Sequence, residues 1–183
     1  KSPMQLVTLS DDGEIEEPEA YETYLIALRQ QLLGLLTDDS WSIEERLQNI
    51  LDLCGTALPE KTWEEWGDVF RALERLDTAW DAVLDTLSLP AKSLGTEWDA
   101  PFRNLAAYFL YRHIPAALYD GDCPAYAAFA VLSTLTIRRL FAAADTQDMA
   151  TLTELCRMYS AEIEYSTENT DALTDLFRVE EEK

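Results

Sequence analysis

AYAAFAVLSTLTIRRLFAAA, residues 125–144, is the stretch that decides the fold. Arg138 and Arg139 carry its only charges, and as a helix it is apolar nearly all round. A helix of this kind normally forms the buried centre of a bundle. The sequence therefore predicts an all-α protein, a bundle of about seven or eight helices around this central apolar helix.

Amphipathic segments on both sides of this stretch predict the helices that surround it. In residues 19–36, apolar side chains recur at every third or fourth position, which places them on one helix face. These are Tyr21, Leu25, Leu28, Leu32 and Leu35.

Local signals mark where several helices begin and end. Residues 42–45 (Ser-Ile-Glu-Glu) and 62–65 (Thr-Trp-Glu-Glu) have the spacing of capping boxes, in which a hydroxyl and a carboxylate satisfy free backbone amides. Gly55 is a candidate stop signal after the first of these helices. Pro115 is expected to kink or end the helix that begins near Asp99.

The sequence predicts three consecutive segments. Residues 1–18 are expected to form an extended arm, residues 19–178 the helical domain, and residues 179–183 an acidic tail. Residues 91–95 separate an amphipathic first half from a more apolar second half. They are a candidate boundary between two subdomains, the alternative to a single core.

The charge of the chain limits its partners. Asp and Glu total 35 against 14 Lys and Arg, a formal net charge of −21. Such a charge repels nucleic-acid phosphates and anionic lipid surfaces, so neither nucleic acid nor a membrane is expected as partner. It attracts basic protein surfaces, although keeping the domain soluble is a sufficient reason for it.

The cysteines point to a reducing compartment. Cys54, Cys123 and Cys156 are the three cysteines, and they are far apart without a C-x-x-C pair. An odd, scattered set is typical of proteins that form no disulfides. No signal peptide is visible, and the uncharged run of residues 123–137 is too short to span a bilayer. We therefore expect a cytoplasmic protein.

Catalytic and metal-binding patterns are missing from the sequence. His113 is the only histidine, so no histidine-rich zinc site can form. The sequence contains no G-x-S-x-G, G-x-G-x-x-G or P-loop motif. Glu162 and Glu164 diverge on a regular helix and do not form a catalytic pair. The sequence predicts no catalytic residue and no metal ligand in this chain.

Arginines beside the most apolar helices are unusual in so acidic a protein. Internal ion pairs would explain them, and so would contact with an anion or cofactor, since guanidinium groups suit bidentate recognition. These arginines are Arg103, Arg112, Arg138 and Arg139.

We expect the polar side chains among these helices to form one pocket that contacts another part of a larger protein. Its candidate residues are Tyr108, Tyr111, Arg112, Arg138 and Glu162.

Four stretches together resemble one protein family. Residues 104–112 (Asn-Leu-Ala-Ala-Tyr-Phe-Leu-Tyr-Arg) resemble the N-Y-L-V-Y-R-like helix of the flagellin lysine-N-methylase family. Residues 120–122 (Asp-Gly-Asp) and 130–138 resemble its next turn and helix. Residues 159–166 resemble its S-R-x-I-E-H-S segment, and residues 41–47 its Y-S-L-E-E-R-L segment.

The resemblance implies that the parent protein methylates flagellin lysines with S-adenosylmethionine as methyl donor. Family members carry an upstream cysteine cluster that is proposed to hold an iron–sulfur centre. This sequence contains none of that cluster, and it has Tyr165 where the family commonly has histidine. The resemblance thus predicts a C-terminal helical region without a cofactor of its own, which scaffolds an N-terminal catalytic region or presents the protein substrate.

The alternative is a non-enzymatic acidic adaptor that binds a basic protein or a partner helix. The chain does not begin with methionine, so we expect a fragment of a longer protein or an engineered piece. A cysteine cluster upstream of Lys1 in the reading frame would favour the methylase interpretation. A gene that begins near Met4 would favour the adaptor.

Overall fold

The computed structural model describes residues 15–178 of the chain. The protein is 74% helical, and the described residues contain no strand, which confirms the predicted all-α class. The expected tail, residues 179–183, and most of the expected arm lie outside the described residues. Of that arm, Pro18 is already the first residue of helix α1 (Pro18–Leu36).

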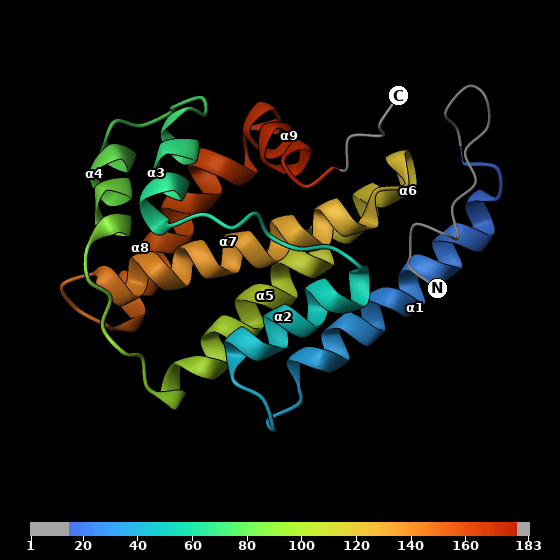
Figure 1. The fold of residues 1–183 in the computed structure, drawn as a ribbon, viewed down its shortest axis with the longest axis horizontal. Helices are drawn as coiled ribbons and strands as arrows, with labels where there is room; N and C mark the ends of the chain where they lie inside the picture. Colours follow the sequence, from blue (N-terminus) through green and yellow to red (C-terminus); the bar gives the residue numbers. More distant parts are fainter. Residues whose placement is uncertain (1–14, 179–183) are drawn as a thin grey trace. The chain divides into compact units, whose positions relative to one another are not determined.

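Figure 1 shows the helices along the chain. The chain divides into two compact units. Unit 1 comprises the described residues 15–58, 96–134 and 177–178, and unit 2 comprises residues 59–95 and 135–176. The chain leaves unit 2 and returns to unit 1 after Gly95. Gly95 is the last residue of the segment 91–95 that the sequence marked as a candidate boundary.

Unit 1 is built on helices that pack against one another. Helix α1 packs against α2 and α5, and α2 packs against α5. The face of α1 that carries Leu25, Leu28 and Leu32 is buried, as its periodicity predicted, but at the end of the stripe Leu36 is buried and Leu35 only half-buried. The helices of this unit are α1, α2 (Ile43–Cys54), α5 (Asp99–His113), α6 (Ala117–Asp120) and the beginning of α7 (Cys123–Ala143).

Helix ends in unit 1 follow the local signals in the sequence. The Ser42 side chain accepts a hydrogen bond from the Glu45 backbone N–H, and the Glu45 carboxylate accepts one from the Ser42 N–H. Gly55 ends α2 with φ at 68°, a left-handed conformation that costs glycine little. Pro115 lies in the 3₁₀ turn η4 (Ile114–Ala116) that follows α5, so the predicted interruption is confirmed.

Unit 2 surrounds an aromatic cluster. Tyr159 is fully buried, and its ring meets the edges of Phe70 and Trp80 with centroids 6.3 and 6.2 Å apart. The helices of this unit are α3 (Trp63–Arg71), α4 (Ala79–Asp85), η2 (Thr86–Ser88), α8 (Met149–Tyr159), the π-helical turn η5 (Ser160–Glu164), α9 (Thr167–Asp175) and the end of α7.

Helix α7 is the apolar helix that the sequence predicted. It continues past the uncharged run 123–137, which alone is too short to span a bilayer, and is the one helix among residues 15–178 whose length and composition would allow it to cross a membrane. Within the protein, however, 78% of its apolar window is buried, as in the core helix of a soluble protein. Its burial is therefore compatible with a soluble protein.

The capping box of α3 gives the protein a testable pH dependence. Hydrogen bonds from the Thr62 backbone and side chain lower the pKa of Glu65. A carboxylate with a lowered pKa contributes stability above its unfolded-state pKa, and this contribution is lost as pH falls through its folded-state pKa. We expect Glu65→Ala to have a lower free energy of unfolding than wild type near neutral pH. The difference in free energy should become smaller in acid.

Urea unfolding at a series of pH values measures this gap. Glu64→Ala is the matched control, because it removes a carboxylate from the same helical turn but no capping bond. A difference between wild type and Glu65→Ala that stays constant with pH would contradict the capping role.

Candidate functional site

Helix α5 presents a polar and aromatic face that its core packing does not use. The side chains of this face are spaced three and four residues apart, so they share one side of the helix. They are Asn104, Ala107, Tyr108, Tyr111 and Arg112. The buried side chains of the same helix are Phe102, Ala106, Phe109, Leu110 and His113.

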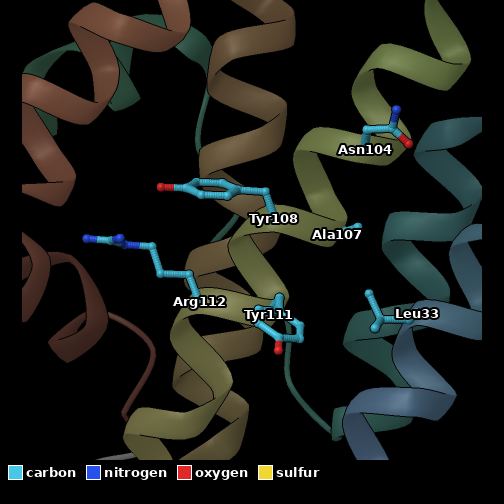
Figure 2. Close-up of a pocket in the computed structure, with 6 residues that line it drawn as sticks. All are labelled: Leu33, Asn104, Ala107, Tyr108, Tyr111 and Arg112. Carbon is cyan, nitrogen blue, oxygen red and sulfur yellow. The ribbon is translucent and has the colours of Figure 1, made fainter.

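This face lines a groove with Leu33 of α1, of about 670 Å³. Tyr108 is 44% exposed and Tyr111 61% exposed. Figure 2 shows Tyr108 and Arg112 projecting from the same side of α5, one helical turn apart, with Leu33 on the neighbouring α1 helix. We call this hollow, with its six lining residues, the α5 groove.

A second, smaller hollow of about 190 Å³ borders the α5 groove. The Arg29 guanidinium lines this second hollow and lies over the Tyr111 ring of the first, 4.4 Å from the ring centroid. The pair therefore stands where the two hollows meet, and the attraction of a cation for the ring face holds both side chains in place. The other residues of the second hollow are Glu22, Leu25, Ile26, Ile114, Pro115 and Leu118.

The predicted pocket residues fall into two groups. Tyr108, Tyr111 and Arg112 come together in the α5 groove of unit 1. Arg138 and Glu162 belong to unit 2.

Glu162 has a structural environment rather than a catalytic one. Its side chain is buried, and its carboxylate oxygens accept hydrogen bonds from the backbone N–H groups of Leu76 and Asp77, at 2.9 and 2.8 Å. The charge of Glu162 is thus directed at the loop before α4.

Arg139, on the same α7 helix as Arg138, also contacts backbone. Its guanidinium donates to the carbonyls of Leu87 and Leu89, at the end of η2. This arginine therefore fixes the position of a loop within unit 2, through backbone carbonyls and not through the internal ion pairs that the sequence analysis considered.

The sequence analysis did not identify three of the residues that line the groove. Asn104 and Ala107 could have been found by stepping back four residues from Tyr108 and from Tyr111 along one helix face. Leu33 could not, because it comes from α1 and lies outside the heptad-like stripe of buried leucines on that helix.

His113 is a packing residue. It is buried, its ring stacks on Phe109, and it meets the edge of Phe129 with ring centroids 4.8 Å apart. Among residues 15–178, no group of three or more histidine, cysteine, aspartate and glutamate side chains could hold a metal ion. These residues therefore offer no ligand set for the iron–sulfur centre, which the resemblance places in an upstream part of the parent protein.

The Asp-Gly-Asp turn at residues 120–122 ties parts of unit 1 together. Gly121 ends α6 in the left-handed region, with φ at 75°, and its carbonyl accepts a hydrogen bond from the Tyr21 hydroxyl. Asp120 accepts hydrogen bonds from the Tyr126 hydroxyl and the Arg178 guanidinium. This motif, which carries part of the family resemblance, is engaged in internal contacts.

The cysteines lie in environments that suppress their reactivity. Cys54 and Cys123 are buried, and the neighbouring Cys54 thiol, burial and the carboxylate of Asp122 raise the pKa of the Cys123 thiol. Burial and the neighbouring Glu164 raise the pKa of Cys156 to about 11. A thiol with a raised pKa supplies little thiolate, which is the nucleophile.

We expect the native protein to show no fast-reacting thiol at pH 8. Only the partly exposed Cys156 should react with a chromogenic disulfide reagent, and slowly, whereas all three cysteines react at once in guanidinium chloride. The colour development of native and unfolded protein measures this difference. Rapid labelling of Cys54 or Cys123 in the native state would contradict the buried pair.

The α5 groove is equipped for binding rather than for chemistry. Its lining offers two tyrosine rings, one amide, one guanidinium and two apolar side chains, and no carboxylate, imidazole or thiol. It holds no general base for removing a proton from an amine. Tyrosine and arginine are instead the residues that dominate protein–protein interfaces.

The chain was compared with protein-family models, with curated proteins and with solved structures, and none of the three comparisons found a match.

Proposed function

We propose that this chain is the C-terminal helical region of a flagellin lysine-N-methylase-like protein, and that it binds the protein substrate or scaffolds the catalytic region. One observation carries the proposal. Of the motifs that resemble the family, the one at residues 104–112 directs Tyr108, Tyr111 and Arg112 to an open groove instead of the core. Side chains of this kind on an exposed face are suited to contact another protein.

The charge of the chain supports a lysine-bearing partner. Its net charge of −21 creates a field that accelerates encounter with a basic protein. Exposed carboxylates lie on both units: examples are Glu19 and Asp52 in unit 1 and Glu60 and Asp68 in unit 2. In this proposal the parent protein acts in the cytoplasm, and S-adenosylmethionine and the iron–sulfur cluster belong to its catalytic region.

Titration of the chain with purified flagellin at low and at moderate salt tests the proposal. We expect binding at low salt that weakens as salt rises, because salt screens the attraction between exposed charges. Flagellin with acetylated lysines is the control, since acetylation removes the positive charge without removing the rest of the surface. It should bind more weakly than the unmodified protein.

Absence of binding, or binding that is equal at both salt concentrations, would count against charge-steered recognition of flagellin. The second candidate function is a stand-alone adaptor that binds a basic protein or a partner helix. If an unrelated basic helical protein binds as tightly as flagellin, the adaptor interpretation replaces the methylase one.

A further inference from the structure

The second hollow exposes apolar surface to solvent. Among its lining residues, Leu25 and Ile114 are buried, whereas Ile26 is 44% exposed. Its volume of about 190 Å³ is below the roughly 300–1,000 Å³ of pockets that bind small molecules. A hollow of this size suits one or two apolar side chains of a polypeptide and not a cofactor.

The sequence before the described residues offers an apolar segment for this hollow. Residues 4–9 read Met-Gln-Leu-Val-Thr-Leu, with four apolar side chains and no charge. They belong to the arm that the sequence predicts ahead of α1. The residues after Arg178 are a poor alternative, because residues 179–183 contain three glutamates and a single apolar side chain.

The length of chain before α1 lets residues 4–9 reach the hollow. The α1 side of the hollow, from Glu22 to Arg29, lies four to eleven residues after Pro18, about 6–17 Å along the helix axis. Residues 4–9 precede Pro18 by nine to fourteen residues, which span up to about 30–46 Å when extended. Between them, residues 11–13 (Asp-Asp-Gly) have the turn chemistry that reverses a chain. The segment can therefore return along α1 as far as Ile26.

The covalent connection favours this segment over a separate molecule. A short flexible linker gives an attached segment an effective concentration in the millimolar range, so even a weak apolar contact is populated. A second copy of the chain would bring another net charge of −21, and like charges oppose association. The contact also leaves the Arg29 guanidinium on the Tyr111 ring, because apolar packing on Ile26 requires no ion pair.

From these observations we infer that residues 4–9 fold back along α1 and cover the second hollow, with apolar side chains of the segment packed on Ile26. The inference concerns a contact within the chain and does not rest on the proposed function. A failure to bind flagellin leaves it standing, because the experiments below need no partner.

Engineered cysteine pairs test the contact in the full chain. Leu6→Cys and Val7→Cys are each combined with Ile26→Cys, oxidised with diamide and mapped by mass spectrometry of the digested protein. In the control pairs Ala27→Cys replaces Ile26→Cys, because Ala27 is an exposed residue of α1 at the same reach that does not line the hollow. We expect at least one Ile26→Cys pair to form an intramolecular disulfide in about tenfold higher yield than its control, since docking raises the local concentration of the two thiols.

Methyl resonances provide a second measurement without new cysteines. A variant with Leu6→Asp and Val7→Asp together should shift the methyl resonances of Ile26, because these charges oppose apolar packing. The methyl resonances of Leu53 are the internal control, since this residue is 40% exposed on α2 and does not line the hollow. They should stay at their wild-type positions.

Three results would overturn the inference. One is an equal disulfide yield for the Ile26→Cys and Ala27→Cys pairs. Another is an Ile26 resonance that the arm substitutions leave unchanged. The third is a set of disulfide-linked dimers in place of the intramolecular link, which would show that a second copy covers the hollow.

Discussion

Glu162→Ala is expected to lower the free energy of unfolding by about 1–3 kcal/mol, because it removes the buried carboxylate that accepts two backbone hydrogen bonds. In the native protein both carboxylate oxygens of Glu162 accept hydrogen bonds, from the N–H groups of Leu76 and Asp77. These two amides lie in the loop before α4, so they are not part of any helical hydrogen-bond ladder. Alanine removes both acceptors and the methylene groups that fill the site.

Asn169 also holds the loop before α4 by hydrogen bonds. Its side-chain carbonyl accepts from the Glu74 N–H, and its amide donates to the carbonyls of Glu74 and Glu162. Glu162 and Asn169 thus secure consecutive parts of one loop. Their substitutions should be non-additive, as is usual for residues of one hydrogen-bond network.

Chemical denaturation followed by circular dichroism measures the loss. Glu162→Gln should also be destabilised, because its NH₂ group would face a backbone N–H where the carboxylate has an acceptor. Glu168→Gln is the control: it removes an exposed carboxylate two residues after the segment 159–166 and should cost less than about 1 kcal/mol. If Glu162→Ala loses no more stability than this control, the loop does not depend on Glu162.

This position shows where sequence reasoning fails. Extrapolated as a regular helix, residues 149–164 direct Glu164 away from the apolar face. The structure instead ends α8 at Tyr159 and continues as the π-helical turn η5, which buries Glu162, Ile163 and Glu164 together. The wider turn changes the register of the side chains, and no local residue pattern signals it. Glu164 is therefore buried instead of pointing away from the core, but its carboxylate accepts a hydrogen bond from Ser160 while that of Glu162 contacts Leu76 and Asp77.

Helix boundaries were predictable where the signal is local. A capping hydroxyl, a glycine in the left-handed region and an internal proline act within a few residues of their own position. The capping boxes at Ser42 and Thr62, the stop at Gly55 and the break at Pro115 are therefore all present in the structure. The burial of α7 was predictable for a related reason, since apolar residues cover nearly its whole surface.

The candidate site was predictable only in part. Tyr108, Tyr111 and Arg112 are spaced by three and four residues, so helical geometry alone brings them together. Leu33 and Arg29 reach the same place from α1, about seventy or eighty residues earlier in the chain, through packing between helices. Spacing within one segment carries no information on such contacts.

Arg46 occupies a position that the sequence pattern assigns to an apolar residue, four residues after the capping serine. The structure explains why arginine is found at this position. The side chain is buried, and its guanidinium donates to the carbonyl of Leu36 at the end of α1 and to the carbonyl of Trp41 in the following loop, at 2.9 and 2.8 Å. The arginine thus satisfies backbone acceptors that the end of a helix leaves open.

We therefore expect Arg46→Met to lower the free energy of unfolding by about 2–4 kcal/mol, through the loss of these buried hydrogen bonds. The ion pair of Arg46 with Asp39 cannot be the main contribution, because the Asp39 side chain is 85% exposed. Exposed pairs contribute at most about 1 kcal/mol. Asp39→Ala, which breaks the ion pair and keeps both carbonyl contacts, should accordingly stay within about 1 kcal/mol of wild type.

Urea unfolding of the two variants separates these contributions. The free energy of unfolding of Arg46→Lys should lie between those of Arg46→Met and Asp39→Ala. A single ammonium group cannot reproduce the guanidinium fork that reaches the carbonyls of Leu36 and Trp41 together. Hydrogen exchange provides a local readout, since the last turn of α1 should lose protection in Arg46→Met and keep it in Asp39→Ala. Equal losses in Arg46→Met and Asp39→Ala would assign the stability to the ion pair and contradict the role of Arg46 as the cap of α1.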